Sequence, residues 1–191
     1  MQLVILVTWM NYRTCMTKIA ITGHTSGIGK ACAEVFSAHE IFGYSTSTGW
    51  DLAEPWKIMK DILRQDCTVF INNAYYQTSQ SELLKQVHAH WKNTNRTIIN
   101  IGSYITDYPR LEKALDSEPW EYRDNKQDLL ATFRTIAQSN TQCNVHMISP
   151  GPVDTPMIKH IDTTKMHACK VASLVNLMLE TPYLKEVTLY D

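Results

Sequence analysis

The hydrophobic pattern of the chain alternates between short β-branched runs, typical of buried strands, and longer segments in which apolar residues recur at helical spacing. Residues 18–22 are such a run, and residues 27–39 show the helical period. Strands are predicted at 18–22, 41–45, 69–74 (ending in a turn), 97–101, 145–148 and 186–190, and helices at 27–39, 55–64, 82–92, 117–136 and 164–180. This alternation predicts a parallel sheet covered on both faces, a single Rossmann-like three-layer αβα domain of the α/β class.

Composition narrows the class of protein without naming an activity. The chain has 191 residues, 44% of them hydrophobic and 19% charged, with a formal net charge of −1. These values fit one ordinary globular domain and give no reason to expect nucleic acid or an anionic membrane as a partner. Five scattered cysteines without a C-x-x-C pair favour reduced thiols in a cytoplasmic protein. The histidines form no metal-ligand pattern, so no metal is predicted.

The first strand runs into a turn with three glycines, Gly23, Gly27 and Gly29, which opens the next helix. In a strand–turn–helix unit the glycines allow a tight turn, the approach of a pyrophosphate, and close packing of the helix against the strand. The helix N-terminus then offers unpaired N–H groups to the phosphates. This context predicts a dinucleotide site.

The spacing Gly-x-x-x-Gly-x-Gly, with Thr22 before it, resembles the short-chain dehydrogenase/reductase family. That resemblance implies a nicotinamide dinucleotide as cofactor and a hydroxyl/carbonyl pair as substrate. It implies that the cofactor is bound by Gly23, Thr25, Ser26, Gly27, Ile28, Gly29, Ser45, Thr46, Asp51, Leu52, Asn73, Ala74, Tyr122, Lys126, Pro150, Gly151, Val153 and Thr155.

Tyr122 and Lys126 are four residues apart on a predicted helix, so they share one face. A lysine cation near a phenol lowers the pKa of the phenol and favours proton exchange near neutral pH. The pair resembles the Tyr-x-x-x-Lys motif of the family, in which the tyrosine is the acid/base and the lysine also binds the nicotinamide ribose. The alternative is an ion pair on an amphipathic helix.

Ser103 follows the strand at 97–101, where the family has its catalytic serine. Its hydroxyl would hold and polarise the substrate oxygen. The alternative is a serine that bonds a nearby turn. Ser103 and Tyr122 are further apart than is usual in the family, which makes residues 108–116 a predicted substrate-facing loop.

Asn72-Asn73-Ala74 resembles the Asn-Asn-Ala-Gly segment of the family, which steadies the sheet and lines the adenosine side, but Tyr75 replaces its glycine. The asparagine that completes the proton relay of the family has no counterpart in the next helix. The relay is therefore expected to be incomplete or rebuilt.

Residues 149–157 follow a strand and resemble the Pro-Gly-x-Val-x-Thr segment of the family. The resemblance implies that the backbone after Gly151 and the Thr155 hydroxyl bind the nicotinamide carboxamide.

Selectivity for the cofactor is set at the end of the second strand, where a carboxylate would favour NAD. Ser45, Thr46 and Ser47 stand there instead, which favours NADP. Asp51-Leu52 resembles the pair that lies beside the adenine in the family. Between the second strand and Asp51 there is no room for a crossover helix. The chain is therefore predicted to lack a helix and a strand that the family normally has.

Residues 1–15 precede Met16, where a chain of this family usually begins. They are expected to be an extension outside the domain at 16–191, or an extra edge strand. The run from Leu3 to Trp9 is too short to span a bilayer and lacks the basic residues of a signal peptide.

Two functions remain in view. The first is an NAD(P)-dependent short-chain dehydrogenase/reductase with Tyr122 as acid/base, acting on a small carbonyl or alcohol. The second is a non-catalytic dinucleotide-binding sensor or scaffold of the same fold. By analogy with the helix-bundle interface of the family, the helices at 82–92 and 117–136 are expected to pair in a homodimer.

Overall fold

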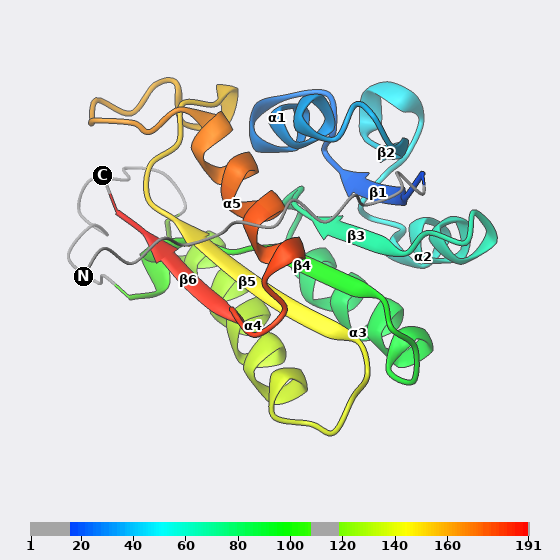
Figure 1. Ribbon diagram of the computed structural model, residues 1–191. Helices are drawn as coiled ribbons and strands as arrows, with labels where there is room; N and C mark the ends of the chain where they lie inside the picture. Colours follow the sequence, from blue (N-terminus) through cyan, green and yellow to red (C-terminus); the bar gives the residue numbers. More distant parts are fainter. Residues whose placement is uncertain (1–15, 108–118, 191) are drawn as a thin grey trace, which may run out of the picture.

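The computed structural model describes residues 16–107 and 119–190 (Figure 1). The predicted extension at 1–15, the predicted substrate loop at 108–116 and the expected helix start at Ser117 lie outside these residues.

The described residues form one sheet of six strands in the order β2-β1-β3-β4-β5-β6. All neighbouring strands are parallel, so the chain crosses over the sheet between each strand and the next. The strands are β1 Lys18–Thr22, β2 Glu40–Tyr44, β3 Val69–Asn72, β4 Thr97–Ile101, β5 Asn144–Pro150 and β6 Glu186–Leu189. The predicted α/β class and parallel sheet are confirmed.

Helices cover both faces of this sheet. The helices are α1 Gly27–Val35, α2 Pro55–Arg64, α3 Ser79–Trp91, α4 Pro119–Ala137 and α5 Ala168–Glu180. Helices α1 and α5 pack together on one face, and α3 packs between α2 and α4 on the other (Figure 1). This is the three-layer arrangement that the alternating pattern predicts.

The chain is short next to β2, as its sequence predicts. After Tyr44 it forms only the 3₁₀ turn η1 (Thr46–Thr48) and further turns before Pro55 begins α2, and all these residues are described. Strand β2 is therefore the edge of the sheet. Helix α2 leads back across β1 to β3, and this reversal of direction creates the crevice in which ligands bind in folds of this kind.

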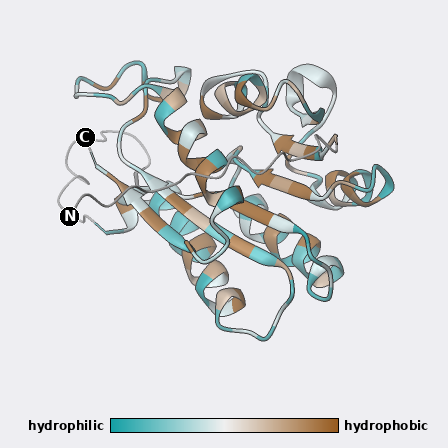
Figure 2. Cartoon of the chain, viewed as in Figure 1, coloured by the Kyte–Doolittle hydropathy of each residue, from teal (hydrophilic) through white to brown (hydrophobic). Residues whose placement is uncertain are grey.

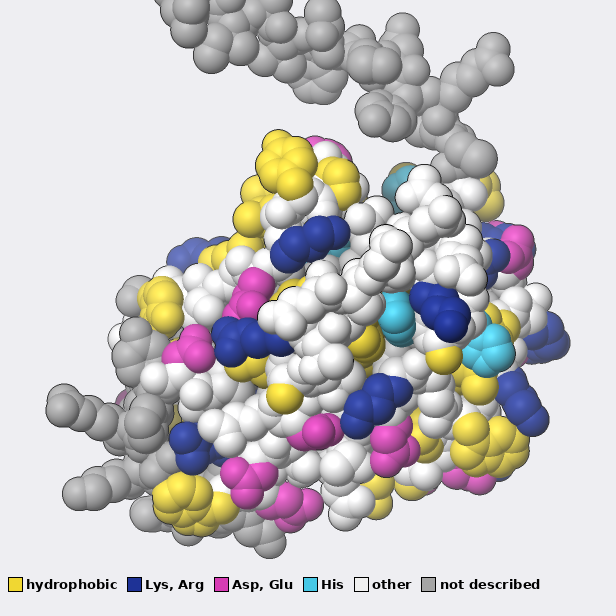
Figure 3. Space-filling view, turned by 90° about the horizontal axis from the view of Figure 1, so that it is seen from below, with side chains coloured by type: hydrophobic (Ala, Val, Ile, Leu, Met, Phe, Trp, Pro, Cys, Tyr) yellow, Lys and Arg dark blue, Asp and Glu magenta, His cyan; other side chains and the backbone are white. Residues whose placement is uncertain are grey.

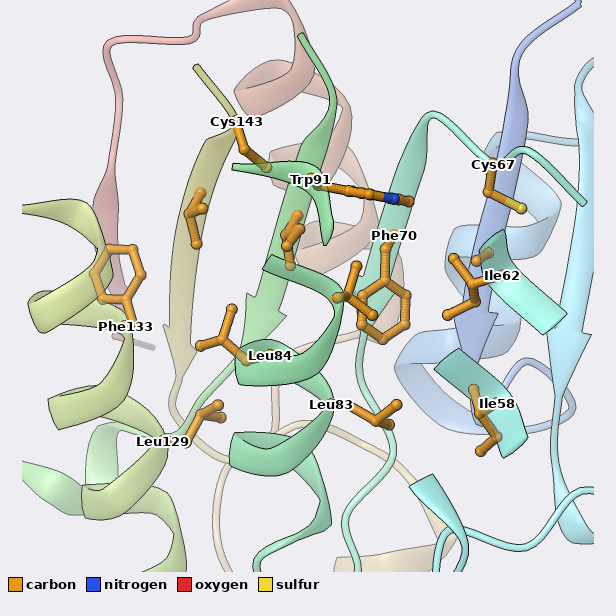
Figure 4. Packing of buried hydrophobic residues seen from close by; sticks show 14 of the residues in the cluster. Ile58, Ile62, Cys67, Phe70, Leu83, Leu84, Trp91, Leu129, Phe133 and Cys143 are labelled. Carbon is orange, nitrogen blue, oxygen red and sulfur yellow. The ribbon is translucent and has the colours of Figure 1, made fainter. Parts of the chain in front are cut away.

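The strands are apolar because both faces of the sheet are buried, as the brown central strands of Figure 2 show. One core cluster lies under α2, α3 and α4, where Leu84 lies between Phe133 and Phe70 (Figure 4). The other lies under α1 and α5 and contains Ile21, Ile99 and Val175. The helices are thus fixed to the sheet by burial of one apolar stripe each.

Three helix boundaries differ from the predicted ones by three residues or more. Helix α1 ends at Val35 rather than residue 39. Helix α3 begins at Ser79 rather than residue 82, because three polar residues that look like a loop are buried in its first turn. Helix α5 begins at Ala168 rather than residue 164, because Met166 is held in a β-bridge with Val153. Contacts distant in sequence decided these last two starts.

Acidic and basic side chains are interspersed over the face shown in Figure 3. No helix among the described residues is both long and apolar enough to cross a membrane. Cys32, Cys67 and Cys143 are buried free thiols, Cys169 is an exposed one, and Cys15 lies outside the described residues.

Candidate active site

A pocket of about 270 Å³ lies at the carboxyl ends of β1, β3, β4 and β5. In parallel sheets ligands bind at this end, where the strand order reverses. Its walls are Gly23, Ser26, Gly27, Ile28, Asn73, Ala74, Tyr75, Ile101, Gly102, Ser103, Tyr122, Lys126, Pro150, Gly151, Val153, Thr155, Pro156, Met157 and Ile158. The pocket therefore brings together four of the sequence segments singled out above.

The glycine turn has the geometry that its spacing predicts. Gly23 and Gly27 adopt positive φ angles of 71° and 53°, which favour glycine. A Cβ on Gly29 would lie 2.2 Å from the Gly23 carbonyl oxygen, so this glycine lets α1 pack against the turn. Gly29 is buried and does not line the pocket. Its role is packing, whereas Gly23 and Gly27 form the pocket wall.

The N-terminus of α1 faces the pocket through Ser26, Gly27 and Ile28. The Ser26 side chain makes no capping hydrogen bond. The N–H groups of a first helical turn have no intrahelical partner, so they are donors for an anion. A Cβ on Gly27 would lie 2.9 Å from the Thr155 methyl carbon, which shows how close the opposite wall comes. This narrow, glycine-lined wall with helix N–H groups fits the pyrophosphate of a dinucleotide.

Thr22 ties the glycine turn to the segment after β3. Its Oγ1 accepts hydrogen bonds from the backbone N–H groups of Asn73 and Ala74, at 2.9 and 3.0 Å. The Asn73 side chain donates to the Thr22 carbonyl oxygen at 2.9 Å. The expectation that Asn-Asn-Ala steadies the sheet agrees with these bonds, and both Asn73 and Ala74 line the pocket.

Tyr75, which stands where the family has glycine, adds an aromatic ring to the pocket. Its ring centroid lies 4.7 Å from that of Tyr122 in an edge-to-face arrangement. Its hydroxyl accepts a hydrogen bond from the Asn125 side chain at 3.1 Å. The replacement therefore places a second tyrosine beside the predicted catalytic one.

Ser103 lies after β4 and bonds the turn that follows it, as one of its two interpretations predicts, while its contact with a substrate oxygen stays a prediction. Its hydroxyl accepts a long bond of 3.4 Å from the Ile105 N–H and so caps η2, the 3₁₀ turn Tyr104–Thr106. The same side chain lines the pocket with the Tyr122 phenol and acts to lower its pKa. Ser103 and Tyr122 are thus brought together at the pocket although they come from different elements.

The net shift of the Tyr122 pKa is opposite to the lowering expected from Lys126. Burial raises the pKa of the Tyr122 phenol to about 12, and the Tyr75 phenol acts in the same direction. Only the Ser103 side chain lowers that pKa. Desolvation of the phenolate outweighs the other influences, so Tyr122 keeps its proton at neutral pH.

Lys126 is 3% exposed and lies at the floor of the pocket. Its Nζ donates to the Gln80 Oε1 at 2.7 Å and to the Ile101 carbonyl oxygen at 2.9 Å. It lies 5.6 Å from the ring centroid of Tyr122, within the range of a cation–π contact. Burial lowers the pKa of the amine to about 7. The alternative of a surface ion pair is therefore wrong.

Gln80 is a site residue that the sequence did not reveal. It is 3% exposed in the first turn of α3, and it contacts Lys126 rather than the pocket itself. Glutamine carries no spacing signal, and this segment resembles a loop in sequence. The polar run at residues 77–82, a few positions after the end of β3, was the sole available hint.

Pro150, Gly151, Val153 and Thr155 line the wall opposite the glycine turn. The Gly151 N–H donates to the Leu189 carbonyl oxygen of β6 at 2.9 Å. The β-bridge between Val153 and Met166 holds the next part of the segment. Residues beyond the predicted ones, Pro156, Met157 and Ile158, extend this wall as the 3₁₀ turn η4.

Besides Gly29, five predicted cofactor residues lie outside the pocket walls. Thr25 and Ser45 are joined with Ser47 in a group of three hydroxyls, in which Ser45 and Ser47 are 2.6 Å apart. Thr46 is exposed in η1. The Asp51 carboxylate accepts from the Ala53 N–H, and Leu52 packs against the core. Their contact with a cofactor stays a prediction.

No protein-family model and no curated protein matches the sequence. Solved structures do match. A short-chain dehydrogenase from Burkholderia cenocepacia J2315 in complex with NADP superposes with a TM-score of 0.74 at 18% identity, covering 92% of this chain and 88% of that one. The 3-alpha-hydroxysteroid dehydrogenase from Pseudomonas sp. B-0831, complexed with NADH, gives 0.73 at 15% identity, with 90% and 95% covered. An alcohol dehydrogenase from the archaeon Thermococcus sibiricus, complexed with 5-hydroxy-NADP, gives 0.67 at 19% identity, with 91% and 96% covered.

These matches show that the chain has the fold of the short-chain dehydrogenases/reductases, as its motifs indicate. The matched proteins have NADP, NADH or a derivative of NADP bound.

Proposed function

We propose that the protein is an NAD(P)-dependent oxidoreductase that interconverts a carbonyl and a hydroxyl group. The observation that supports this most is the meeting of Ser103, Tyr122 and Lys126 in one pocket with a glycine turn on its other side. A serine hydroxyl, a phenol and an amine at the carboxyl end of a Rossmann-type sheet are groups suited to proton transfer beside a dinucleotide.

The residues that would hold the dinucleotide are those of the two facing walls. The amides of α1 at Ser26, Gly27 and Ile28 suit the pyrophosphate, and Gly151 and Thr155 suit the nicotinamide end. When bound, the cofactor supplies or accepts a hydride. Fold alone does not establish this chemistry, so the proposal depends on the side chains at the site.

The protein's own contribution to reduction is a proton donated from Tyr122. With a pKa of about 12 the phenol is protonated at neutral pH, as a general acid must be. Ser103 and Tyr122 line the same pocket and their hydroxyls interact, so a carbonyl oxygen held by Ser103 would lie within reach of the Tyr122 proton. The raised pKa keeps the phenol at neutral pH in the acid form that carbonyl reduction needs.

NADP(H) is the favoured cofactor in this proposal. The hydroxyls of Ser45 and Ser47, after β2, and of Thr25, in the turn after β1, form a neutral group with no carboxylate in it. Hydroxyls can donate to a 2′-phosphate, whereas a carboxylate would repel it.

One observation favours the alternative of a dinucleotide-binding sensor or scaffold without turnover. Two hydrogen bonds of the Lys126 amine are already made to Gln80 and Ile101 within the protein. The ring of Tyr75 lies beside the amine as well, with its centroid 5.8 Å away. A lysine held in this way could serve the structure of the pocket rather than a reaction.

The deciding experiment is a screen of aldehydes and ketones with NADPH and with NADH, followed by cofactor absorbance. Turnover of any carbonyl by the purified protein supports the enzyme. Tight cofactor binding by calorimetry without turnover of any compound would favour the sensor, and failure to bind either cofactor would reject both.

A further inference from the structure

The amine of Lys126 is buried, and no residue of 16–107 or 119–190 supplies a counter-ion for it. Among the described residues, the groups that face it are the Gln80 amide from α3, the Ile101 carbonyl oxygen from β4, and the rings of Tyr75 and Tyr122. The two phenols are the titratable groups in this set, and no carboxylate of the described chain forms an ion pair with Lys126. A buried cation in such surroundings depends on its hydrogen-bond acceptors.

The orientation of the Gln80 amide is fixed by its other contacts. Its Nε2 donates to the carbonyl oxygens of Asn72 at 2.9 Å and Ile101 at 3.2 Å. Turning the amide over would place its oxygen against these carbonyls and its NH₂ group against the lysine. The side-chain oxygen therefore faces the amine, as an acceptor must.

The backbone of Gln80 is held equally well. Its carbonyl oxygen accepts a hydrogen bond from the Asn72 side chain at 2.8 Å. Asn72 also donates to the Asn100 Oδ1 on β4 at 3.0 Å. Gln80 thus joins the ends of β3 and β4 to the first turn of α3, and its side chain is presented to Lys126 from a rigid base.

We propose that Gln80 is the positioning residue for Lys126, holding its amine at the floor of the pocket by a direct hydrogen bond with a neutral acceptor. The early start of α3, soon after Asn73, is what brings the glutamine within reach. The neutral amide supplies an acceptor without an opposite charge, so the amine can change its protonation state without breaking an ion pair. The consequence for turnover rests on the proposed function, whereas the contact itself does not.

The test compares the native protein with Gln80→Glu and Gln80→Met. Glutamate keeps the length of the side chain and adds a charge next to the amine, so the pKa of Lys126 should rise by at least one unit, a tenfold gain in proton affinity. Methionine has similar length and no strong acceptor, so that pKa should fall. NMR titration of isotope-labelled lysine, assigned with Lys126→Met, measures the pKa directly and needs no substrate.

The matched control is Gln138→Glu. This residue is exposed and lies 12 positions after Lys126, about 18 Å further along the direction of α4. The substitution Gln138→Glu makes the same chemical change far from Lys126, so it should leave the titration of Lys126 unchanged. A general effect of net charge would instead move the titration in both glutamate variants.

An unchanged Lys126 titration in folded Gln80→Glu would overturn the inference. If that variant does not fold, the Gln80→Met titration decides, and an unchanged pKa there overturns it as well. The pH profile of carbonyl reduction should shift in the same direction as the pKa in each variant. A native protein that turns over no carbonyl contradicts the proposed function and leaves the NMR result standing.

Discussion

The two sides of the pocket offer a ligand different kinds of contact. The glycine-turn side consists of Gly23, Ser26, Gly27 and Ile28. The lysine side consists of Ser103, Tyr122 and Lys126, with Gln80 behind the lysine. The first presents backbone shape and helix N–H groups, with no titratable side chain among its four residues. The second presents polar side chains, and desolvation shifts the pKa values of two of them, Tyr122 and Lys126. The first should respond to changes of size, and the second to changes of charge and pH.

The difference also explains how each side departs from its family resemblance. A backbone wall needs only the positions that permit its φ angles and close contacts, and here these are kept. A side-chain network can be rebuilt with other residues as long as buried donors and acceptors are paired. On the lysine side, Tyr75 and Gln80 form such pairs with Asn125 and Lys126.

The largest effect is expected on the lysine side, from Tyr122→Phe. The change removes the proton donor with almost no change in ring volume, and general acid catalysis is worth about 10²–10⁴ in rate. Turnover of any carbonyl found by screening should fall by about that factor, with cofactor affinity retained. The measurement is kcat with NADPH or NADH, with the 83% exposed Tyr183 changed to Phe as control. Full activity in Tyr122→Phe would require another proton donor.

On the glycine-turn side, Gly27→Val should abolish measurable cofactor binding. The side chain would meet Thr155 across the pocket, at a φ of 53° that suits glycine. The matched control is Gly49→Val, since Gly49 has a φ of 84° with nothing within 4 Å of its Cβ position. Both variants bear the backbone strain of about 1–2 kcal/mol, but only the first obstructs the pocket. Calorimetry that shows native affinity in folded Gly27→Val would reject this wall as the cofactor site.

Stability should depend on pH through Lys126. Its pKa is lowered in the folded state from 10.5 to about 7, so between these values the unfolded state binds more protons. Stability therefore rises with pH above about 7, by at most ~1.4 kcal/mol per pH unit for one group. Burial raises the pKa values of Cys32, Cys67 and Cys143 from 9.0 to about 12, and these thiols act in the opposite direction above pH 9.

Urea unfolding at pH 7, 8 and 9 checks this prediction. The free energy of unfolding of the native protein minus that of Lys126→Met should rise over this range, because only the native protein has the titrating amine. The thiols are present in both proteins, so their contribution cancels in this difference. The exposed Lys159, changed to Met, serves as the control. A flat difference for Lys126→Met would mean that the amine is not desolvated as its burial indicates.

The smallest expected effect concerns the choice of cofactor. The native protein should bind NADP(H) at least as well as NAD(H). Ser45→Asp should weaken NADPH binding several-fold through repulsion of the 2′-phosphate, an effect of about 1 kcal/mol near the surface. Calorimetry with both cofactors measures the ratio, and Ser139→Asp on an exposed turn is the control. A clear preference of the native protein for NAD(H) would contradict the interpretation of Ser45 and Ser47.

Local sequence determined most of the fold, because its signals are short in range. Strand β1, helix α2 and strand β4 have the bounds that periodicity predicts, 18–22, 55–64 and 97–101. The spacing of the glycines likewise predicted the turn between β1 and α1, because positive φ angles limit which residues can occupy these positions. The lack of room between β2 and Asp51 was enough to predict the loss of a crossover.

Only the tertiary structure decided the lysine side. The sequence brought Tyr122 and Lys126 to one helix face, but whether the amine would meet phenol, solvent or amide depended on elements far away in the chain. Helix α3 supplied Gln80 across 46 positions, and β4 supplied the Ile101 carbonyl oxygen across 25. Desolvation is a property of everything packed around a group. For that reason spacing alone predicted a lowered pKa for Tyr122, and the folded pocket raises it.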